Sequence, residues 1–262
     1  MSKIIAVANE KGGVAKTTTA ISLGGAFVLA GKSVLLVDMD PQASLTIYFG
    51  FYPSESFTST ADILINSAVP KVLSTGIPRL NIIPASRDLS LADRFLTVRK
   101  DSIKILKEAL SSFRDFDVII IDCPPSLGIT TQNALVAADL LITPVTPEYL
   151  AVNTLRTIFQ LIRSIRSTEN PTLVYRILFT IVDKRIRSHL TISSRFRDKF
   201  PSAVLKTQIR VDTRIRDASM IGVPVMMYAP KTRSALEYQS LITEITPELG
   251  DDSNSSNTMK TA

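Results

Sequence analysis

The chain has 262 residues, of which 45% are hydrophobic, and this is enough for one large core of the single-domain kind. It contains no apolar run of about 18 residues, so we expect no membrane-spanning helix. Glu10 and Lys11 interrupt the first apolar run, which argues against a signal peptide. The single cysteine, Cys123, rules out a disulfide within the chain and suits a reducing compartment. These observations favour a cytoplasmic protein.

The first predicted strand, 3–8, ends in a glycine-bearing loop that leads into a predicted helix over 17–30. Residues 9–17 of this loop read Asn-Glu-Lys-Gly-Gly-Val-Ala-Lys-Thr. Small residues let backbone N–H groups approach phosphate oxygens, and a helix N-terminus adds unpaired donors and the positive end of its dipole. Lys16 offers a cation to the β- and γ-phosphates, and Thr17 offers a hydroxyl to Mg²⁺. The segment therefore predicts a nucleotide-phosphate site.

Two further predicted strands end in carboxylates. Asp38 and Asp40 follow a strand over 33–37, and Asp122 follows a strand over 117–121. The carboxyl ends of parallel strands form the ligand sites of such sheets, so these groups are expected to lie near the loop. Asp122 is predicted to hold Mg²⁺ through its water shell. Asp38 is placed in the Mg²⁺ environment, with a helix-cap or turn role left open.

The rest of the chain continues to alternate between strand and helix patterns. This alternation predicts an α/β fold, a single-domain, mostly parallel twisted sheet with helices on both faces. The domain is expected to span 1–248, and the polar residues 249–262 to form a disordered tail. Further strands are expected at 80–83, 140–144, 176–182 and near 205–209, and helices at 101–113, 131–137, 150–166, 189–199 and 232–245.

Positive charge is concentrated in the second half of the chain. Between Arg156 and Arg216 there are fourteen Lys and Arg residues and four acidic residues. This span therefore carries +10 and the remainder −4, for a total of +6. A basic region on an otherwise acidic protein indicates a polyanionic partner. Because no base-reading motif is present, contact with phosphates without sequence preference is favoured. A solvated surface with excess arginine is the alternative.

The pattern Lys-Gly-Gly-x-x-Lys-Thr at 11–17 resembles the deviant Walker A box of the ParA/MinD family of ATPases. The segments Val-Leu-Leu-Val-Asp-Met-Asp-Pro-Gln at 34–42 and Val-Ile-Ile-Ile-Asp-Cys-Pro-Pro at 118–125 carry the resemblance further. It runs from Lys3 to about Ile245 and is nearest to short, Soj-like partition ATPases. It implies a P-loop fold, hydrolysis of ATP, and ATP and Mg²⁺ as cofactors.

The resemblance also assigns roles to single residues. Lys16 contacts the phosphates in its own subunit, whereas Lys11 crosses a dimer interface to the partner's nucleotide, and Asp40 orients the attacking water. Lys11, Lys16 and Asp40 are therefore the catalytic candidates. The residues expected to hold Mg²⁺ are Thr17, Asp38 and Asp122. Nucleotide contacts are expected from Lys11, Gly12, Gly13, Val14, Ala15, Lys16, Thr17 and Thr18, with Arg210 and Asp212 beside the adenine.

The implied partners are a second copy of the chain when ATP is bound, double-stranded DNA, and a ParB-like centromere-binding protein that stimulates hydrolysis. The resemblance implies association with the nucleoid. Within the basic region, the residues expected to contact DNA without sequence preference are Lys184, Arg185, Arg187, Arg195, Arg197, Arg214 and Arg216.

Two positions depart from the Soj-like pattern. Ala15 replaces a glycine, and its methyl group strains the loop if this residue needs a positive φ. Residues 209–214 read Ile-Arg-Val-Asp-Thr-Arg where close relatives carry Ile-Pro-Arg-Asn-Val-Arg. This difference places the adenine contacts in doubt.

Three other functions remain open. A membrane-cycling ATPase like MinD would end in a basic amphipathic helix, which the Ser/Asn-rich end of this chain does not resemble, so no membrane partner is expected. A related switch could position a protein cargo on the nucleoid. A metabolic enzyme of the same fold, such as an amidoligase-type ATPase, would need a substrate pocket that the sequence does not reveal.

Overall fold

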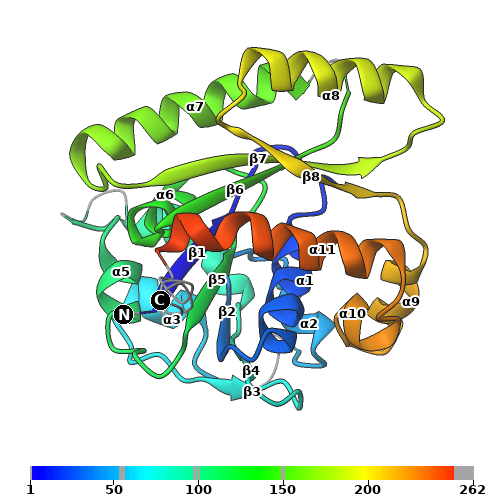
Figure 1. Ribbon diagram of the computed structural model, residues 1–262. Coiled ribbons are helices and arrows are strands. Elements are labelled where there is room, and N and C mark those ends of the chain that lie inside the picture. The colour runs from blue at the N-terminus through cyan, green and yellow to red at the C-terminus, as the bar shows by residue number, and fades with distance from the viewer. Residues whose placement is uncertain (1, 53–56, 97–98, 100, 149–150, 251–262) are drawn as a thin grey trace, which may run out of the picture.

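The computed structural model describes residues 2–52, 57–96, 99, 101–148 and 151–250 (Figure 1). Residues 251–262, most of the predicted tail, lie outside the described residues, so the predicted tail stays a prediction. Within the described part, no helix combines the length and apolarity needed to cross a membrane.

One sheet of eight strands organises the molecule, in the order β3-β4-β2-β5-β1-β6-β7-β8 (Figure 1). Among the described strands, only the β3–β4 pair is antiparallel, and the other neighbours are parallel. The strands are β1 (Lys3–Val7), β2 (Val34–Asp38), β3 (Leu73–Ser74), β4 (Leu80–Ile83), β5 (Val118–Asp122), β6 (Leu140–Val145), β7 (Val174–Val182) and β8 (Val204–Arg210).

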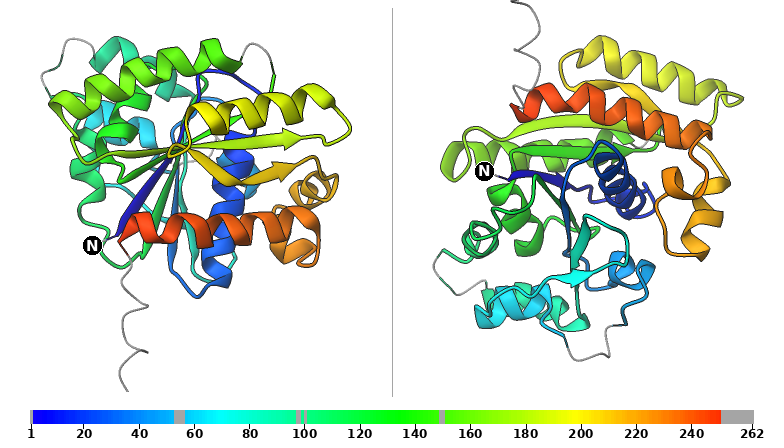
Figure 2. Two further views of the ribbon diagram at one scale, coloured as in Figure 1. Left: turned by 45° about the horizontal axis from the view of Figure 1, so that its top comes forward. Right: turned by 60° about the horizontal axis from the view of Figure 1, so that its bottom comes forward.

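Helices cover both faces of the sheet, as predicted (Figure 2). Successive residues of each central strand enter opposite cores: Leu35 and Val37 belong to one core, and Val34 and Leu36 to the other. This alternation follows from the two-residue period of a strand and explains why both sets are apolar.

The first core is covered by α3 (Thr60–Asn66), η1 (Arg87–Leu91), α4 (Ala92–Leu96), α5 (Ile105–Leu110), α6 (Ile129–Ala137), α7 (Ala151–Thr168) and α8 (Arg187–Lys199). The second is covered by α1 (Lys16–Leu29), α2 (Ser44–Tyr48), α9 (Arg214–Met220), α10 (Val225–Tyr228), α11 (Arg233–Ile245) and η2 (Thr246–Leu249).

All seven predicted strands are present, and six predicted helices are found, although the one expected at 101–113 is confined to α5. Asp101 there has a φ of 57°, and residues 101–104 form turns and bends. The sequence did not predict β3 or the helical segments α2, α3, η1, α4, α9, α10 and η2. The three shortest α-helices among these, α2, α4 and α10, have five, five and four residues, too few to show a helical period in the sequence.

Strand register brings the predicted carboxylates together. Asp122 at the end of β5 pairs with Val7 of β1 on one side and with Asp38 of β2 on the other. The loop after β1 therefore begins beside both aspartates. From β1 the chain continues to β2 in one direction along the strand order, whereas β6 neighbours β1 in the other direction. Open parallel sheets bind ligands at such a change of direction, at the carboxyl ends of the strands.

Candidate nucleotide-binding site

The loop between β1 and α1 is held by the ends of neighbouring strands. The Asn9 side chain donates to the Pro144 carbonyl of β6 at 2.7 Å, and the Thr180 hydroxyl of β7 donates to the Val14 carbonyl at 2.9 Å. The second bond holds the Val14 carbonyl toward the sheet, and the N–H groups of the loop are left for another partner. Among the described residues, no hydrogen bond is donated by the N–H groups of Gly12, Gly13, Val14 or Ala15.

Two loop residues adopt left-handed backbone conformations. Gly13 has a φ of 73°, and Ala15, directly before α1, has a φ of 65° and a ψ of 38°. Glycine occupies this region without penalty, whereas a side chain with a Cβ is strained there. The sequence analysis predicts strain at Ala15 if its φ is positive, and in the structure this φ is positive. A Cβ on Gly12 would meet no atom within 4 Å, so packing inside the chain does not require glycine there.

Lys16 lies inside the loop rather than in solvent, because α1 begins at this residue and its side chain folds back. Its ammonium donates to the Lys11 carbonyl at 3.1 Å, and the residue is 8% exposed. Burial lowers the pKa of the Lys16 ammonium, although the nearby Asp122 carboxylate acts in the opposite direction. A buried cation behind a row of free N–H groups forms an anion site.

Asp122 is completely buried, and neither of its carboxylate oxygens has a hydrogen-bond partner among the described residues. Burial raises the pKa of Asp122 well above its usual range, and the Asp38 charge adds to this rise. The Thr17 hydroxyl is close enough to oppose the shift but makes no hydrogen bond of good geometry. A buried carboxylate without a partner is costly. Hydrated Mg²⁺ beside Thr17 would supply both donors and charge, so these residues fit that ion.

Asp38 is already satisfied within the protein. One of its oxygens accepts from the Asp40 N–H at 3.0 Å. The other accepts from the Thr46 N–H at 2.9 Å and from the Thr46 hydroxyl at 2.6 Å. Burial raises the pKa of Asp38 to about 6, against the lowering effect of these bonds. Asp38 thus ties the loop after β2 to α2, a turn-organising arrangement that the sequence analysis left open.

Asp40 lies in that same loop and is 8% exposed. Its Oδ1 accepts from the Gln42 N–H at 2.9 Å. Its charge opposes the lowering of the Lys16 pKa and raises the pKa of Asp122, so all three groups share one electrostatic environment. The described residues therefore bring Lys16, Asp40 and Asp122 together, as predicted.

Lys11 has a partner that the sequence analysis missed. Its ammonium forms an ion pair with Glu148 and lies 3.5 Å from the Thr146 hydroxyl. The pKa of Glu148 is lowered by the hydrogen bond from Lys11. Glu148 follows the apolar strand β6, and this position after a strand is the sequence signal that could have identified it.

The two adenine candidates are engaged elsewhere. Arg210 forms an ion pair with Glu237 of α11, and Asp212 accepts from the N–H groups of Arg214 and Ser234. A cavity of about 240 Å³ instead adjoins the loop, lined by α1, α2 and α9. Arg216 lines it together with Thr17 and Thr18. The base contacts of Arg210 and Asp212 stay predictions.

The DNA candidates fall into two groups along the sheet. Lys184, Arg185 and Arg187 follow β7, and Arg214 and Arg216 follow β8, all at the carboxyl edge that carries the phosphate loop. Arg185 pairs with Asp183 and Arg214 with Asp217. The second group lies farther along α8, where Arg197 donates to the Lys206 carbonyl near the start of β8 at 3.0 Å and Arg195 is exposed.

A left-handed glycine loop, a buried lysine at a helix start and a partnerless carboxylate in register beside them define a nucleoside-triphosphate site. Comparisons with known proteins give the same class. A family described as AAA domain matches residues 2–175. The sporulation initiation inhibitor protein Soj of Bacillus subtilis is 36% identical, covering 94% of this chain and 98% of its own. The chromosome partitioning protein ParA of Caulobacter vibrioides is 33% identical, covering 93% of each.

A solved structure of cobyrinic acid a,c-diamide synthase from Mycobacterium smegmatis, with bound ADP and magnesium, superposes with a TM-score of 0.83. It is 32% identical and covers 96% of each chain. A second structure of that protein holds an ATP analogue and magnesium.

The chain belongs to the ParA/MinD family and is an ATPase of the Soj and ParA type. Its cofactors are ATP and Mg²⁺.

The strain at Ala15 predicts a stabilising substitution. A residue with a Cβ in the left-handed region costs roughly 1–2 kcal/mol, and this exceeds the entropic cost of a glycine. We expect Ala15→Gly to raise the free energy of unfolding by up to about 1 kcal/mol, as measured by urea denaturation. Ala30 at the other end of α1 has a φ of −78° and is the control. Ala30→Gly should lower stability, and equal losses in both variants would contradict the strain.

The partnerless carboxylate predicts opposite effects on stability and activity. Without Mg²⁺ or nucleotide, Asp122→Asn should stabilise the protein by at least about 1 kcal/mol near pH 8, because it removes a buried charge. It should also abolish Mg²⁺-dependent ATP hydrolysis. Thermal unfolding in a chelator and a phosphate-release assay measure the two effects.

The stability difference between Asp122→Asn and the wild type should depend on pH. A carboxyl with a raised folded-state pKa favours folding at low pH and loses this advantage as the pH rises toward that pKa. The wild type therefore loses stability relative to the variant as the pH rises from about 4, the ordinary carboxyl pKa, toward the raised folded-state pKa. A difference that shrinks over this interval would show that Asp122 is not buried as a costly charge.

Proposed function

We propose that the protein is an ATP-dependent switch for DNA partition, whose ATP-bound dimer binds DNA without sequence preference and is released on hydrolysis stimulated by a ParB-like partner. The observation that carries this proposal is the juxtaposition of free loop N–H groups, buried Lys16 and partnerless Asp122 at the edge where the basic loops also lie. Its partition relatives support the same role.

Each loop residue has a task in this proposal. The free N–H groups and Lys16 bind phosphate oxygens, and the Thr17 hydroxyl and Asp122 hold hydrated Mg²⁺, which supplies positive charge to the phosphates when bound. Asp40 orients the attacking water and accepts a hydrogen bond from it. Its second oxygen is suited to this, since Oδ1 alone is used by Gln42. Catalysis then rests on positioning and on charge stabilisation.

In this proposal, dimer formation depends on whether the bound nucleotide is a triphosphate. Lys11, paired with Glu148 in its own chain, exchanges this partner for the triphosphate of a second subunit. That exchange is favourable only while the triphosphate charge is present, so hydrolysis weakens the interface. Gly12 is exposed and has no neighbour that would hinder a Cβ, which leaves room for a partner backbone.

DNA binding follows from the position of the basic loops. Lys184, Arg185 and Arg187 are exposed beside the same sheet edge as the nucleotide loop. A dimer formed across that edge places two such loops on one side and neutralises more phosphates than one subunit does. Nucleotide state then sets DNA affinity.

The similarity to a cobyrinic acid a,c-diamide synthase supports a second candidate, amidation of a carboxylic acid driven by ATP. An amidoligase activates the carboxylate with ATP, so its hydrolysis of ATP depends on the acid and on an amine donor. Turnover of ATP that is unchanged by cobyrinic acid and ammonia, but raised by DNA and a ParB-like protein, would separate the two candidates.

The Lys11–Glu148 pair predicts how easily the dimer forms. Glu148→Gln removes the charge that competes for Lys11, and exposed ion pairs contribute at most about 1 kcal/mol. We therefore expect the ATP-dependent dimer to tighten by up to about fivefold. Lys11→Ala should abolish dimerisation while keeping ATP bound. Sedimentation with ATP, ADP and a non-hydrolysable analogue measures both, and Glu10→Gln, on the same exposed loop, is the control. An unchanged mass with all three nucleotides would refute the dimer.

Charge reversal at the basic loop should separate DNA binding from dimerisation. We expect the double variant Arg185→Glu and Arg187→Glu to abolish binding to unrelated duplexes in fluorescence anisotropy and to keep the ATP-dependent dimer. If about six phosphates are contacted, wild-type affinity should fall roughly a thousandfold between about 50 and 200 mM salt. Arg114→Glu, exposed just before β5, is the control. Equal affinity with ADP and ATP would contradict the switch.

A further inference from the structure

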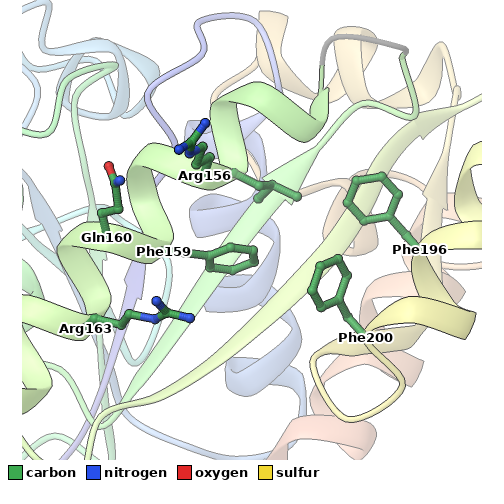
Figure 3. A pocket seen from close by; sticks show the side chains of 7 residues that line it. Arg156, Phe159, Gln160, Arg163, Phe196 and Phe200 are labelled. Atoms are coloured by element: carbon green, nitrogen blue, oxygen red, sulfur yellow. The ribbon is translucent and has the colours of Figure 1, made fainter.

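A hollow of about 500 Å³ opens between α7 and α8, on the sheet face opposite α1. Its floor is aromatic. Phe159 points from α7 toward Phe196 and Phe200 on the other side (Figure 3), and the ring centroids of Phe159 and Phe200 are 5.9 Å apart. Phe196 lies 5.9 Å from Phe200 and is buried, whereas Phe159 and Phe200 are half-buried. The hollow is thus an outward extension of the core.

The rim of the hollow is positively charged. Arg156, Gln160 and Arg163 line it from α7 and are exposed. In the described part of the chain these three side chains form no hydrogen bond or ion pair. The two arginines are seven residues apart, so they lie on the same face of the helix, separated by about 10 Å. None of the described lining residues is acidic.

We propose that this hollow binds an acidic segment of a partner protein, with an apolar side chain seated on the phenylalanines and carboxylates paired with Arg156 and Arg163. An apolar centre with a charged rim is the usual anatomy of a protein interface, and arginine and aromatic residues dominate binding energy in such places. The inference does not rest on the proposed function, because no residue of the nucleotide loop lines the hollow.

Other occupants fit less well. A small metabolite needs polar groups fixed inside its pocket, whereas all three polar side chains here are exposed at the rim. Duplex DNA offers phosphates to the arginines but would leave the apolar floor uncovered. A second copy of the chain in a two-fold dimer would bring the same arginines of both subunits together, which is repulsive.

The test is a selection from a displayed library of random peptides against the full chain. We expect enriched peptides to carry Asp or Glu on both sides of a Phe, Leu or other large apolar residue. In fluorescence anisotropy, replacing that apolar residue by Ala, or the acids by their amides, should weaken binding at least about tenfold. No enrichment of acidic-apolar peptides over the starting library would overturn the proposal.

The protein variants locate the site. Arg156→Glu with Arg163→Glu should weaken the selected peptides at least about tenfold, since two attractive pairs become repulsive. Arg166→Glu is the matched control, because Arg166 is exposed on α7 outside the hollow, and it should change affinity less than twofold by the same argument. Equal peptide binding by the double variant would overturn the proposal. Loss of duplex DNA binding or of dimerisation with peptide binding intact would assign the arginines to those partners instead.

Discussion

The buried charge of Asp122 is the constraint on which the rest of the site depends. Both of its oxygens lack a hydrogen-bond partner in the described residues, and two further aspartates lie within electrostatic reach. Such a buried carboxylate is explained when a bound ligand supplies the hydrogen bonds and positive charge that the chain does not. Lys16 compensates in part, but burial lowers its own pKa. The nucleotide-free protein therefore holds a charge arrangement that Mg²⁺ and a triphosphate complete, which links ligand binding to stability.

The two loop lysines differ in burial. Lys16 is buried and its ammonium donates to the loop carbonyl of Lys11, so its position is set before the nucleotide binds. Lys11 instead holds an exposed ion pair with Glu148, which is weak and easily exchanged. One lysine is thus preorganised for its own nucleotide, and the other is free to change partners. This difference in burial supports the proposal that the two lysines contact the nucleotides of different subunits.

The two helical layers leave different surfaces for partners. On the α1 side, α11 also closes the edge of the sheet, since Glu244 accepts from the Lys206 and Thr207 N–H groups and Glu237 from the Arg210 N–H. Capping these donors blocks strand addition at β8. On the other side, α7 and α8 diverge over the phenylalanine hollow. The nucleotide loop at the sheet edge and the hollow between α7 and α8 therefore lie on separate parts of the molecule.

The sequence by itself determined the parallel sheet, the phosphate loop and the strand-end aspartates, because apolar runs of fixed period and a glycine-lysine loop are local signals. Tertiary structure decided what depends on neighbours distant in sequence. It placed Asp38 in hydrogen-bond contact with Thr46 and paired Lys11 with Glu148. Among the described residues, it left Asp122 without a hydrogen-bond partner. It also set Ala15 in a left-handed conformation and brought Phe159 and Phe200 together from two helices. Strand register and helix packing fix these contacts, and neither can be read from a single segment.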